Sequence, residues 1–260
     1  MARGQVAVIT GATSGIGLGL AEGFAAAGYR LAINGLAAPG EPEALVERLH
    51  RRYSVEVFYH PADLTDPAQC EALVRDTENR FGSIDVLVNN AGIQHVAPIE
   101  SFPVEQWDRI LAVNLSAAFH TMRMALPGMQ RRGAGRIINI ASVHGMVASI
   151  HKAAYVAAKH GIVGLTRVAA LENAARGITC NAICPGFVHT PLVQKQIDAR
   201  AAQEGISAED AARELLSEKQ PSGRFTTVEE IAAAALFLCS PAAANLNGVC
   251  LPIDGAWTAQ

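Results

Sequence analysis

Three side chains in the middle of the sequence are of types that could move a proton at an alcohol or carbonyl oxygen. They are Ser142, Tyr155 and Lys159. Tyr155 and Lys159 stand four residues apart in an alanine-rich run that favours helix, so both would lie on one helix face. A phenol has a reference pKa of about 10, and a neighbouring ammonium lowers this pKa by favouring the phenolate. The spacing therefore predicts a tyrosine that acts as acid and base.

A tyrosine and a lysine four residues apart also occur on ordinary helices that carry no catalytic site. The surrounding elements therefore have to show whether this pair belongs to one. Ser142 follows an apolar run, Arg-Ile-Ile-Asn-Ile-Ala over residues 136–141, which is typical of a buried strand in a parallel sheet. Its hydroxyl would then lie at the carboxyl end of that strand. Parallel sheets of this kind bind their ligands at that edge.

The rest of the chain alternates strand-like runs with helical runs. Strands are expected over residues 5–10, 30–34, 55–60, 84–89, 136–141, 178–184 and 249–253, and helices over 15–28, 41–53, 67–81, 103–113, 115–132, 152–175 and 228–239. This alternation predicts an α/β fold, a Rossmann-like doubly wound parallel sheet of about seven strands with helices on both faces. Residues 1–260 are expected to form one domain. The charged, helical stretch 187–221 is interpreted as a substrate lid.

Composition argues against several classes of partner. The net charge is −3 and no basic run occurs, so nucleic acid and anionic membranes are not expected partners. No segment approaches the roughly 20 apolar residues of a membrane span, and the N-terminus passes directly into a strand without a signal peptide. The five cysteines are odd in number and lack zinc spacing. We expect reduced thiols, no metal and a cytoplasmic protein.

The glycine-rich turn over residues 10–17 follows the first strand and opens a helix, which indicates a site for the pyrophosphate of a dinucleotide. Three residues, instead of one, separate its first two glycines, so it departs from the G-x-G-x-x-G pattern. The second strand ends without the acidic residue expected to hold a ribose, although Asn34 could partly substitute through its amide. No cation stands at Ser14 or at residues 34–38 to pair with a 2′-phosphate. This favours NAD over NADP.

Three further residues allow two interpretations each. Asp63, just after the third strand, either caps a turn or contacts an adenine. Asn114, between two helical runs, either bends the helix or holds a water that relays protons to Lys159, and both can be true. Trp257 could anchor the C-terminal segment at an interface or over the site.

Taken together, these motifs resemble the classical short-chain dehydrogenase/reductase family over essentially the whole chain. The resemblance rests on Thr-Gly-Ala-Thr-Ser-Gly-Ile-Gly at 10–17, Asn-Asn-Ala-Gly at 89–92, Tyr-Val-Ala-Ala-Lys at 155–159, Asn114, Ser142 and Pro185-Gly186. It implies a homotetramer in which Tyr155 is the acid–base, Lys159 lowers its pKa, Ser142 orients the substrate oxygen and Asn114 completes a proton relay. It also implies cofactor contacts from Gly11, Thr13, Ser14, Gly15, Ile16, Gly17, Leu36, Asp63, Leu64, Asn90, Ala91, Gly92, Val113, Tyr155, Lys159, Pro185, Gly186, Val188 and Thr190.

Within that family, residues 92–95, 114–120, 138–145, 152–161, 182–197 and 214–222 are similar to the bacterial D-3-hydroxybutyrate dehydrogenases. This implies NAD-dependent interconversion of (R)-3-hydroxybutyrate and acetoacetate. The implied substrate contacts are Gln94, His144, Lys152 and Gln196 at the carboxylate, together with Ser142, Tyr155, Phe187 and Trp257. One cation, one histidine and two amides suit a carboxylate, because hydrogen bonds to a charged group are the stronger kind.

The sequence departs from that narrower pattern at four places. Phe187 stands where tryptophan is frequent, His189 where arginine is frequent, His151 where asparagine is usual and Ala256 where a glycine is usual. Two other functions compete with the dehydrogenase. A β-ketoacyl-thioester reductase, acting on acetoacetyl-CoA or an acyl carrier, would need a basic 2′-phosphate pocket. A non-catalytic dinucleotide sensor would show a degraded set of catalytic residues, and here the set is intact.

Overall fold

Seven parallel strands form a single sheet in a computed structural model of the chain, which describes residues 4–259. The strands are β1 (Val6–Ile9), β2 (Arg30–Asn34), β3 (Val57–His60), β4 (Val86–Asn89), β5 (Gly135–Ile140), β6 (Ile178–Pro185) and β7 (Cys250–Ile253), in the spatial order β3-β2-β1-β4-β5-β6-β7. The order reverses direction between β1 and β4, and doubly wound folds open their ligand crevice at such a point. The predicted Rossmann-like sheet is confirmed.

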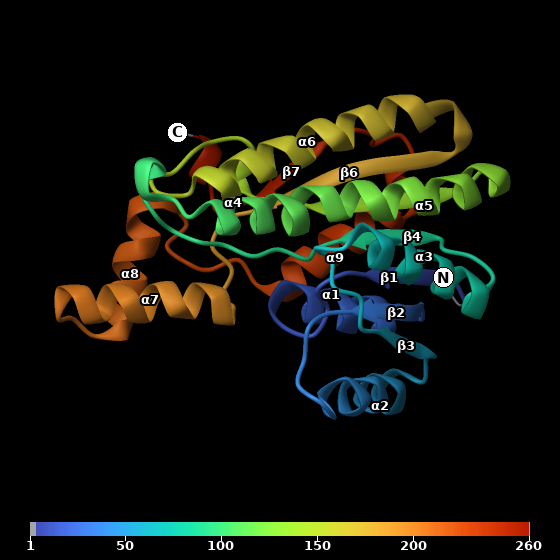
Figure 1. Cartoon of the computed structure of the whole chain (residues 1–260), viewed down its shortest axis with the longest axis horizontal. Coiled ribbons are helices and arrows are strands. Elements are labelled where there is room, and N and C mark those ends of the chain that lie inside the picture. The colour runs from blue at the N-terminus through green and yellow to red at the C-terminus, as the bar shows by residue number, and fades with distance from the viewer. Residues whose placement is uncertain (1–3, 260) are drawn as a thin grey trace.

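Helices cover both faces of this sheet (Figure 1). They are α1 (Gly15–Ala26), α2 (Glu41–Tyr53), α3 (Pro67–Phe81), α4 (Val104–Leu111), α5 (Ala117–Arg132), α6 (Ala153–Asn173), α7 (Pro191–Glu204), α8 (Ala208–Lys219) and α9 (Val228–Cys239). One core cluster joins α1, α2 and α9 to the sheet, and a second joins α3, α5 and α6 to its other face. None of these helices, within residues 4–259, is long and apolar enough to cross a membrane.

Burial on both faces explains why the central strands are continuously apolar. In β1, Ala7 and Ile9 pack in the core beneath α1 and α9, whereas Val6 and Val8 pack in the core beneath α3 and α5. All four side chains are 0% exposed. Successive side chains of a strand point to opposite faces, so a strand covered on both sides has no polar positions.

The helix boundaries agree with the sequence except around Asn114. Helices were expected over 103–113 and 115–132, but α4 and α5 are joined by a π-helical segment over Ala112–Ser116. The buried Asn114 side chain accepts a hydrogen bond from the backbone N–H of Ile93 (2.8 Å) and donates one to the carbonyl oxygen of Ile93 (2.9 Å). Single π-helical turns often mark functional positions. Here the turn fastens the helix to the segment that follows β4.

Helices α7 and α8 stand away from the sheet as a separate projection (Figure 1), in the stretch where the sequence predicted helix. Arg200 links the two helices through ion pairs with Glu204, Glu214 and Glu218. Their inner side contributes Val193, Ile197, Ala211 and Leu216 to an apolar cluster that also contains Phe187 and Trp257. The projection therefore packs against residues at the carboxyl edge of the sheet.

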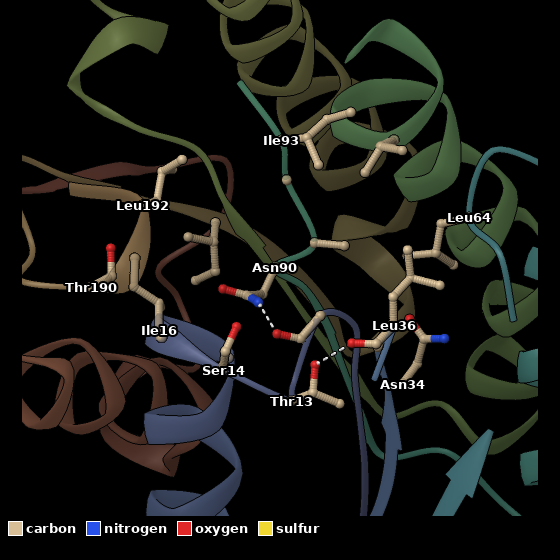
Figure 2. A pocket seen from close by; sticks show the side chains of 18 of the residues that line it. Thr13, Ser14, Ile16, Asn34, Leu36, Leu64, Asn90, Ile93, Thr190 and Leu192 are labelled. Carbon is tan, nitrogen blue, oxygen red and sulfur yellow. Dashed lines mark hydrogen bonds between the residues drawn. The ribbon is translucent and has the colours of Figure 1, made fainter. Parts of the chain in front are cut away.

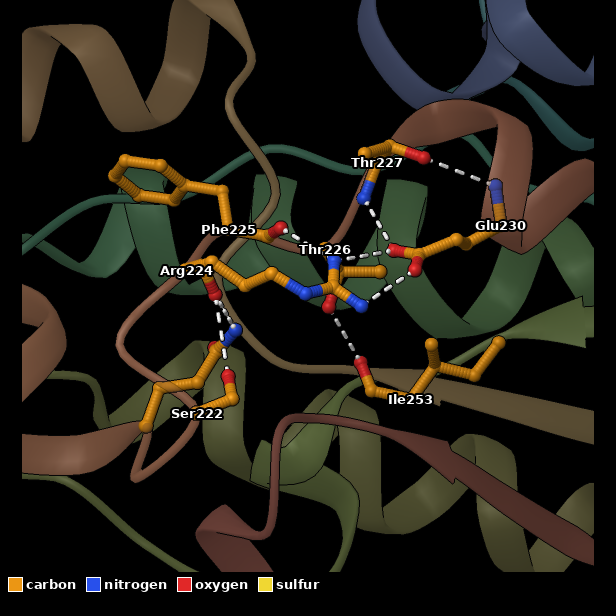
Figure 3. A network of polar contacts seen from close by, with 8 residues as sticks. Ser222, Arg224, Phe225, Thr226, Thr227, Glu230 and Ile253 are labelled. Atoms are coloured by element: carbon orange, nitrogen blue, oxygen red, sulfur yellow. Dashed lines mark hydrogen bonds and ion pairs between the residues drawn. The ribbon is translucent and has the colours of Figure 1, made fainter.

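A polar network anchors the end of this projection to the body of the fold (Figure 3). The guanidinium of Arg224 donates two hydrogen bonds to the carboxylate of Glu230, at 3.0 and 2.7 Å. Thr227 and Glu230 form a capping box that begins α9, and the hydroxyl of Thr226 donates to the carbonyl oxygen of Ile253 in β7 at 2.9 Å. The chain thus returns to the sheet at a fixed point.

Candidate active site

A cavity of about 360 Å³ opens at the carboxyl ends of β1, β2 and β4, where the strand order reverses. Figure 2 shows its labelled side chains arranged around Asn90, whose amide donates to the carbonyl oxygens of Thr10 (2.8 Å) and Gly11 (3.1 Å). Gly11 has φ +64°, and a Cβ atom there would lie 2.8 Å from the Cα of Ala91. Only glycine permits this close approach of the first turn to the end of β4.

The start of α1 is suited to hold an anionic group in this cavity. Ser14 is the N-cap residue, its side chain makes no capping hydrogen bond, and the first turn of the helix contains no acidic residue. The first N–H groups of a helix have no partner within the helix and carry partial positive charge. The turn and the helix start therefore fit the pyrophosphate of a dinucleotide.

Asn34 provides a buried acceptor in the same cavity. Its amide nitrogen donates to the carbonyl oxygens of His60 (3.0 Å) and Ala62 (2.9 Å), which fixes the orientation of the side chain. Its Oδ1 atom is buried and has no hydrogen-bond partner among the described residues. A buried acceptor without a donor is costly, so this oxygen suits a ligand hydroxyl better than a phosphate oxygen.

Asp63 and Arg109 line the cavity near one another. The carboxylate of Asp63 accepts from the backbone N–H of Thr65 (2.9 Å) and from its hydroxyl (2.8 Å), so it does cap the turn after β3. These bonds, and to a smaller extent Arg109, hold the pKa of Asp63 below its ordinary value. No sequence pattern indicated Arg109, because it reaches the cavity from α4, far along the chain from the positions expected to meet a 2′-phosphate.

A second cavity of about 90 Å³ adjoins the first, and Ile16, Ala141, Tyr155, Thr190 and Leu192 line both. Every residue expected to contact the substrate lines the second cavity: Gln94, Ser142, His144, Lys152, Tyr155, Phe187, Gln196 and Trp257. These residues come from the ends of β4, β5 and β6, the start of α6, the projection and the C-terminal segment. Tyr155 thus stands at the junction of the two cavities.

The environment of Tyr155 differs from the expectation based on spacing. Burial raises its pKa, and a hydrogen bond from the Ser142 hydroxyl partly offsets this. The Lys159 Nζ atom lies 5.6 Å from the centroid of the tyrosine ring and donates to the carbonyl oxygen of Ile140 at 2.7 Å. Burial lowers the pKa of Lys159 to about 8. In the chain by itself, burial therefore determines the direction of the Tyr155 pKa shift, and Lys159 is not among its causes.

His144 and Lys152 also line the second cavity. Burial lowers the pKa of His144 to about 3, with smaller contributions from the charges of Lys152, Lys219 and His160, so the ring is neutral near pH 7. Burial, and then the charge of Lys219, also lower the pKa of Lys152. The His144 ring meets Tyr155 and Trp257 edge to face, at centroid distances of 5.8 and 5.5 Å. The cavity therefore combines a cation with a rigid aromatic wall.

Most of the expected cofactor residues line the first cavity: Gly11, Thr13, Ser14, Gly15, Ile16, Gly17, Leu36, Asp63, Leu64, Asn90, Ala91, Gly92, Val113, Tyr155, Lys159 and Thr190. Pro185, Gly186 and Val188 line the second cavity instead, and Asn114 lines neither. Besides Arg109, the sequence reasoning did not anticipate Ile93, Ile140 and Leu192 as lining residues. Ile93 could have been inferred, since it directly follows the glycine at the end of β4.

Comparisons with known proteins agree with this geometry. Residues 5–201 match the profile of the short chain dehydrogenase family. The chain is 54% identical over 260 residues to a D-beta-hydroxybutyrate dehydrogenase of Cupriavidus necator, covering 100% of both chains. It is 52% identical over 256 residues to one of Rhizobium meliloti, covering 98% of this chain and 99% of the other. The crystal structure of levodione reductase superposes with a TM-score of 0.91 at 37% identity, covering 99% and 98%.

Proposed function

Because the chain belongs to the short chain dehydrogenase family of oxidoreductases, we propose that it interconverts (R)-3-hydroxybutyrate and acetoacetate with NAD. One observation carries this proposal. The second cavity is lined by the hydroxyl groups of Ser142 and Tyr155, and Tyr155 also lines the first cavity, which we call the dinucleotide cavity. Lys152 is among the other residues that line the second cavity. A short 3-hydroxy acid has its reacting carbon and its carboxylate only a few atoms apart, so both would lie in this one cavity.

Asn34 and Leu36 support NAD as the form of the nicotinamide dinucleotide. The unpaired Oδ1 of Asn34 would accept a hydrogen bond from a ribose hydroxyl and would repel a phosphate. Leu36 lies at the rim with 70% of its surface exposed and offers no charge to a 2′-phosphate. Arg109, which lines the cavity as Lys159 does, is close enough to Asp63 to lower its pKa.

In the proposed oxidation, Tyr155 accepts the proton of the substrate hydroxyl while Ser142 donates a hydrogen bond to the same oxygen as its negative charge develops. When bound, the oxidised nicotinamide supplies the acceptor for the hydride of the carbinol carbon and a positive charge beside the phenol. Lys159 adds its buried ammonium over the tyrosine ring, 5.6 Å from the ring centroid. Both charges favour the phenolate and oppose the effect of burial on its pKa.

Asn114 and Lys159 form the inner end of the proposed proton path. The Asn114 side chain is committed to Ile93, and its π-helical turn leaves irregular backbone beside α6 that can hold a water. Lys159, with a pKa of about 8, can exchange a proton with such a water near neutral pH. The path would return Tyr155 to its starting state after each turnover.

The carboxylate of the substrate would lie among Lys152, Gln94 and Gln196, with His144 closing the same end of the cavity. A charge-assisted hydrogen bond from Lys152 gives this end its preference for an anion. Phe187 and Trp257, whose ring centroids are 4.9 Å apart, would face the terminal methyl group. Gln196 belongs to α7, so binding would be coupled to the position of the projection, which we propose acts as a lid.

We also propose a homotetramer in the cytoplasm. Large apolar side chains are exposed on the outer sides of α4, α5 and α6, namely Val104, Trp107, Phe119, Val168 and Leu171. Burying such surfaces against other copies of the chain is the usual reason for their exposure. Light scattering at micromolar concentration would report four times the chain mass if this is correct.

Initial rates of NAD reduction test the function. The assay compares (R)-3-hydroxybutyrate with its (S) isomer. A parallel assay follows the reduction of an acetoacetyl-thioester with NADPH. We expect turnover of the (R) acid with NAD and little of the other two. Turnover of the thioester with NADPH alone would favour the competing β-ketoacyl-thioester reductase. Binding of NAD without any turnover would favour a dinucleotide sensor.

A further inference from the structure

After β7 the chain forms a tight turn that leads to Trp257 in the wall of the second cavity. Two consecutive residues of this turn are left-handed, with φ +57° at Gly255 and +73° at Ala256. Glycine tolerates this conformation, but at an alanine the Cβ atom strains it. Such strain persists only where surrounding contacts hold the backbone in place, so the contacts of the turn indicate what it maintains.

Asp254, at the start of the turn, holds the residues on either side of Trp257. Its Oδ1 atom accepts a hydrogen bond from the backbone N–H of Ala256 at 3.1 Å. Its Oδ2 atom accepts two from Thr258, one from the backbone N–H at 2.9 Å and one from the hydroxyl at 2.7 Å. The backbone oxygen of Asp254 also accepts from the N–H of Trp257 itself, at 3.1 Å. One residue thus fixes the backbone before, at and after the indole.

The carboxylate of Asp254 depends on these bonds in turn. Asp254 is only 7% exposed, and its carboxylate forms no ion pair with any cation among residues 4–259. Burying a carboxylate without a cation is costly unless hydrogen bonds replace its hydration. The three donors of the turn supply this replacement. The carboxylate and the strained turn therefore stabilise each other.

Trp257 connects the turn to the second cavity. Its indole lines that cavity and is 7% exposed. The ring centroid lies 5.5 Å from that of His144 and 4.9 Å from that of Phe187. The turn is also tied to the base of the projection, because the backbone N–H of Ser222 donates to the carbonyl oxygen of Gly255 at 3.0 Å. A shift of the turn would therefore move one wall of the cavity.

We propose that Asp254 is a positioning residue that fixes Trp257 as a rigid wall of the second cavity, and thereby sets the affinity for a short hydroxy acid. A wall that is in place before the substrate arrives needs no ordering when the substrate binds. Asp254 lines neither cavity, so it acts through Trp257. The kinetic part of this inference rests on the proposed function, whereas the position of Trp257 does not.

The position of Trp257 is measured by fluorescence without any substrate. The chain has two tryptophans, so Trp107→Phe leaves the emission of Trp257 alone. In this background, Asp254→Asn replaces one acceptor oxygen by an NH₂ group, and whichever way the amide is turned, a donor of the turn loses its partner. We expect a red shift of the emission and stronger quenching by acrylamide, because the indole becomes exposed. An unchanged emission would overturn the inference.

Steady-state kinetics test the consequence for the substrate. Asp254→Asn should raise KM for (R)-3-hydroxybutyrate about tenfold, as the loss of one methyl contact in an apolar pocket does, with little change in kcat or in KM for NAD. Asp66→Asn is the matched control, because the Asp66 carboxylate accepts the same kind of turn hydrogen bond at the start of α3, outside both cavities. An unchanged KM for the acid, or an equal rise in Asp66→Asn, would overturn the inference.

A milder variant keeps the inference testable should Asp254→Asn fail to fold. Thr258→Val removes only the hydroxyl bond, so it should change the emission and the KM in the same direction by a smaller factor, whereas Thr258→Ser keeps the hydroxyl and should match the wild type. Wild-type emission and KM in Thr258→Val would contradict the role of the turn. Should the wild-type enzyme not oxidise (R)-3-hydroxybutyrate, the proposed function is wrong, but the emission still decides whether Asp254 holds Trp257.

Discussion

Lys159 donates a hydrogen bond of 2.7 Å from its ammonium to the carbonyl oxygen of Ile140, the last residue of β5. The bond connects the helix that carries Tyr155 with the strand end from which Ser142 emerges. The lysine is 3% exposed, and burial lowers its pKa to about 8. The fold therefore holds a positive charge at a place where burial disfavours it, and it does so beside the tyrosine that is proposed to transfer the proton.

Replacing Lys159 should abolish activity and should also change how the free energy of unfolding depends on pH. Between pH 8 and the ordinary lysine pKa of 10.5, the unfolded chain binds the proton that the folded chain has released, so wild-type stability should rise with pH there, by about 3 kcal/mol in total. Lys159→Met should lack this rise and should also lack activity. Urea unfolding of both proteins from pH 7 to 10 measures the difference. Parallel curves would mean that Lys159 titrates normally.

His144 should produce a dependence of the same sign, a stability that rises with pH, in the acid range. Its pKa is about 3 in the folded chain and 6.5 ordinarily, so the unfolded chain takes up a proton first as the pH falls, and stability should fall from pH 6.5 downward. One such group contributes a slope of up to about 1.4 kcal/mol per pH unit. His144→Gln should flatten the slope between pH 6.5 and 5.

Leu36 is the position at which cofactor preference should be easiest to change. Its side chain is 70% exposed at the rim, and the contact that holds the loop, from the hydroxyl of Thr13, goes to its backbone oxygen. Leu36→Arg should therefore leave the fold intact and tighten NADP binding by about tenfold through a charged hydrogen bond to the phosphate. Dissociation constants for both dinucleotides, with Ile99→Arg as the exposed control, measure this. An unchanged NADP affinity would show that this rim does not face the ribose.

Phe187 should set the length of the acid that the second cavity accepts. The ring is 7% exposed and packs on Trp257, whereas its backbone N–H is held by Gln220 independently of the side chain. Phe187→Ala should cost about 3–5 kcal/mol of stability and raise the preference for 3-hydroxypentanoate over 3-hydroxybutyrate on the order of tenfold. Phe187→Leu is a milder variant, and Phe225→Leu, outside both cavities, is the control. An unchanged preference would remove Phe187 from the substrate site.

The architecture could be read from the sequence because buried parallel strands are continuously apolar and alternate with helices. β1, for example, is apolar on both sides since helices cover both faces. The ends of the strands and helices were less certain, because the local sequence does not determine where the backbone hydrogen bonds of an element stop. The π-helical turn at Asn114 was not foreseen, because it depends on hydrogen bonds with Ile93, 21 residues earlier in the chain.

The site was predictable where spacing alone brings groups together, as with Tyr155 and Lys159 on one helix. It was not predictable where distant segments meet. Arg109, for example, reaches the dinucleotide cavity from α4. The pKa of Tyr155 also depends on burial, which spacing cannot reveal.

The role of Tyr155 is tested most directly by the rate of NAD reduction with (R)-3-hydroxybutyrate in the wild-type enzyme and in Tyr155→Phe. Removing the phenol hydroxyl should lower kcat by a factor of about 10²–10⁴, because no other group at the junction of the two cavities can accept the proton. NAD should still bind, since the glycine turn and Asn34 are untouched. A wild-type enzyme without activity on this acid, or a Tyr155→Phe variant with nearly normal turnover, would contradict the account.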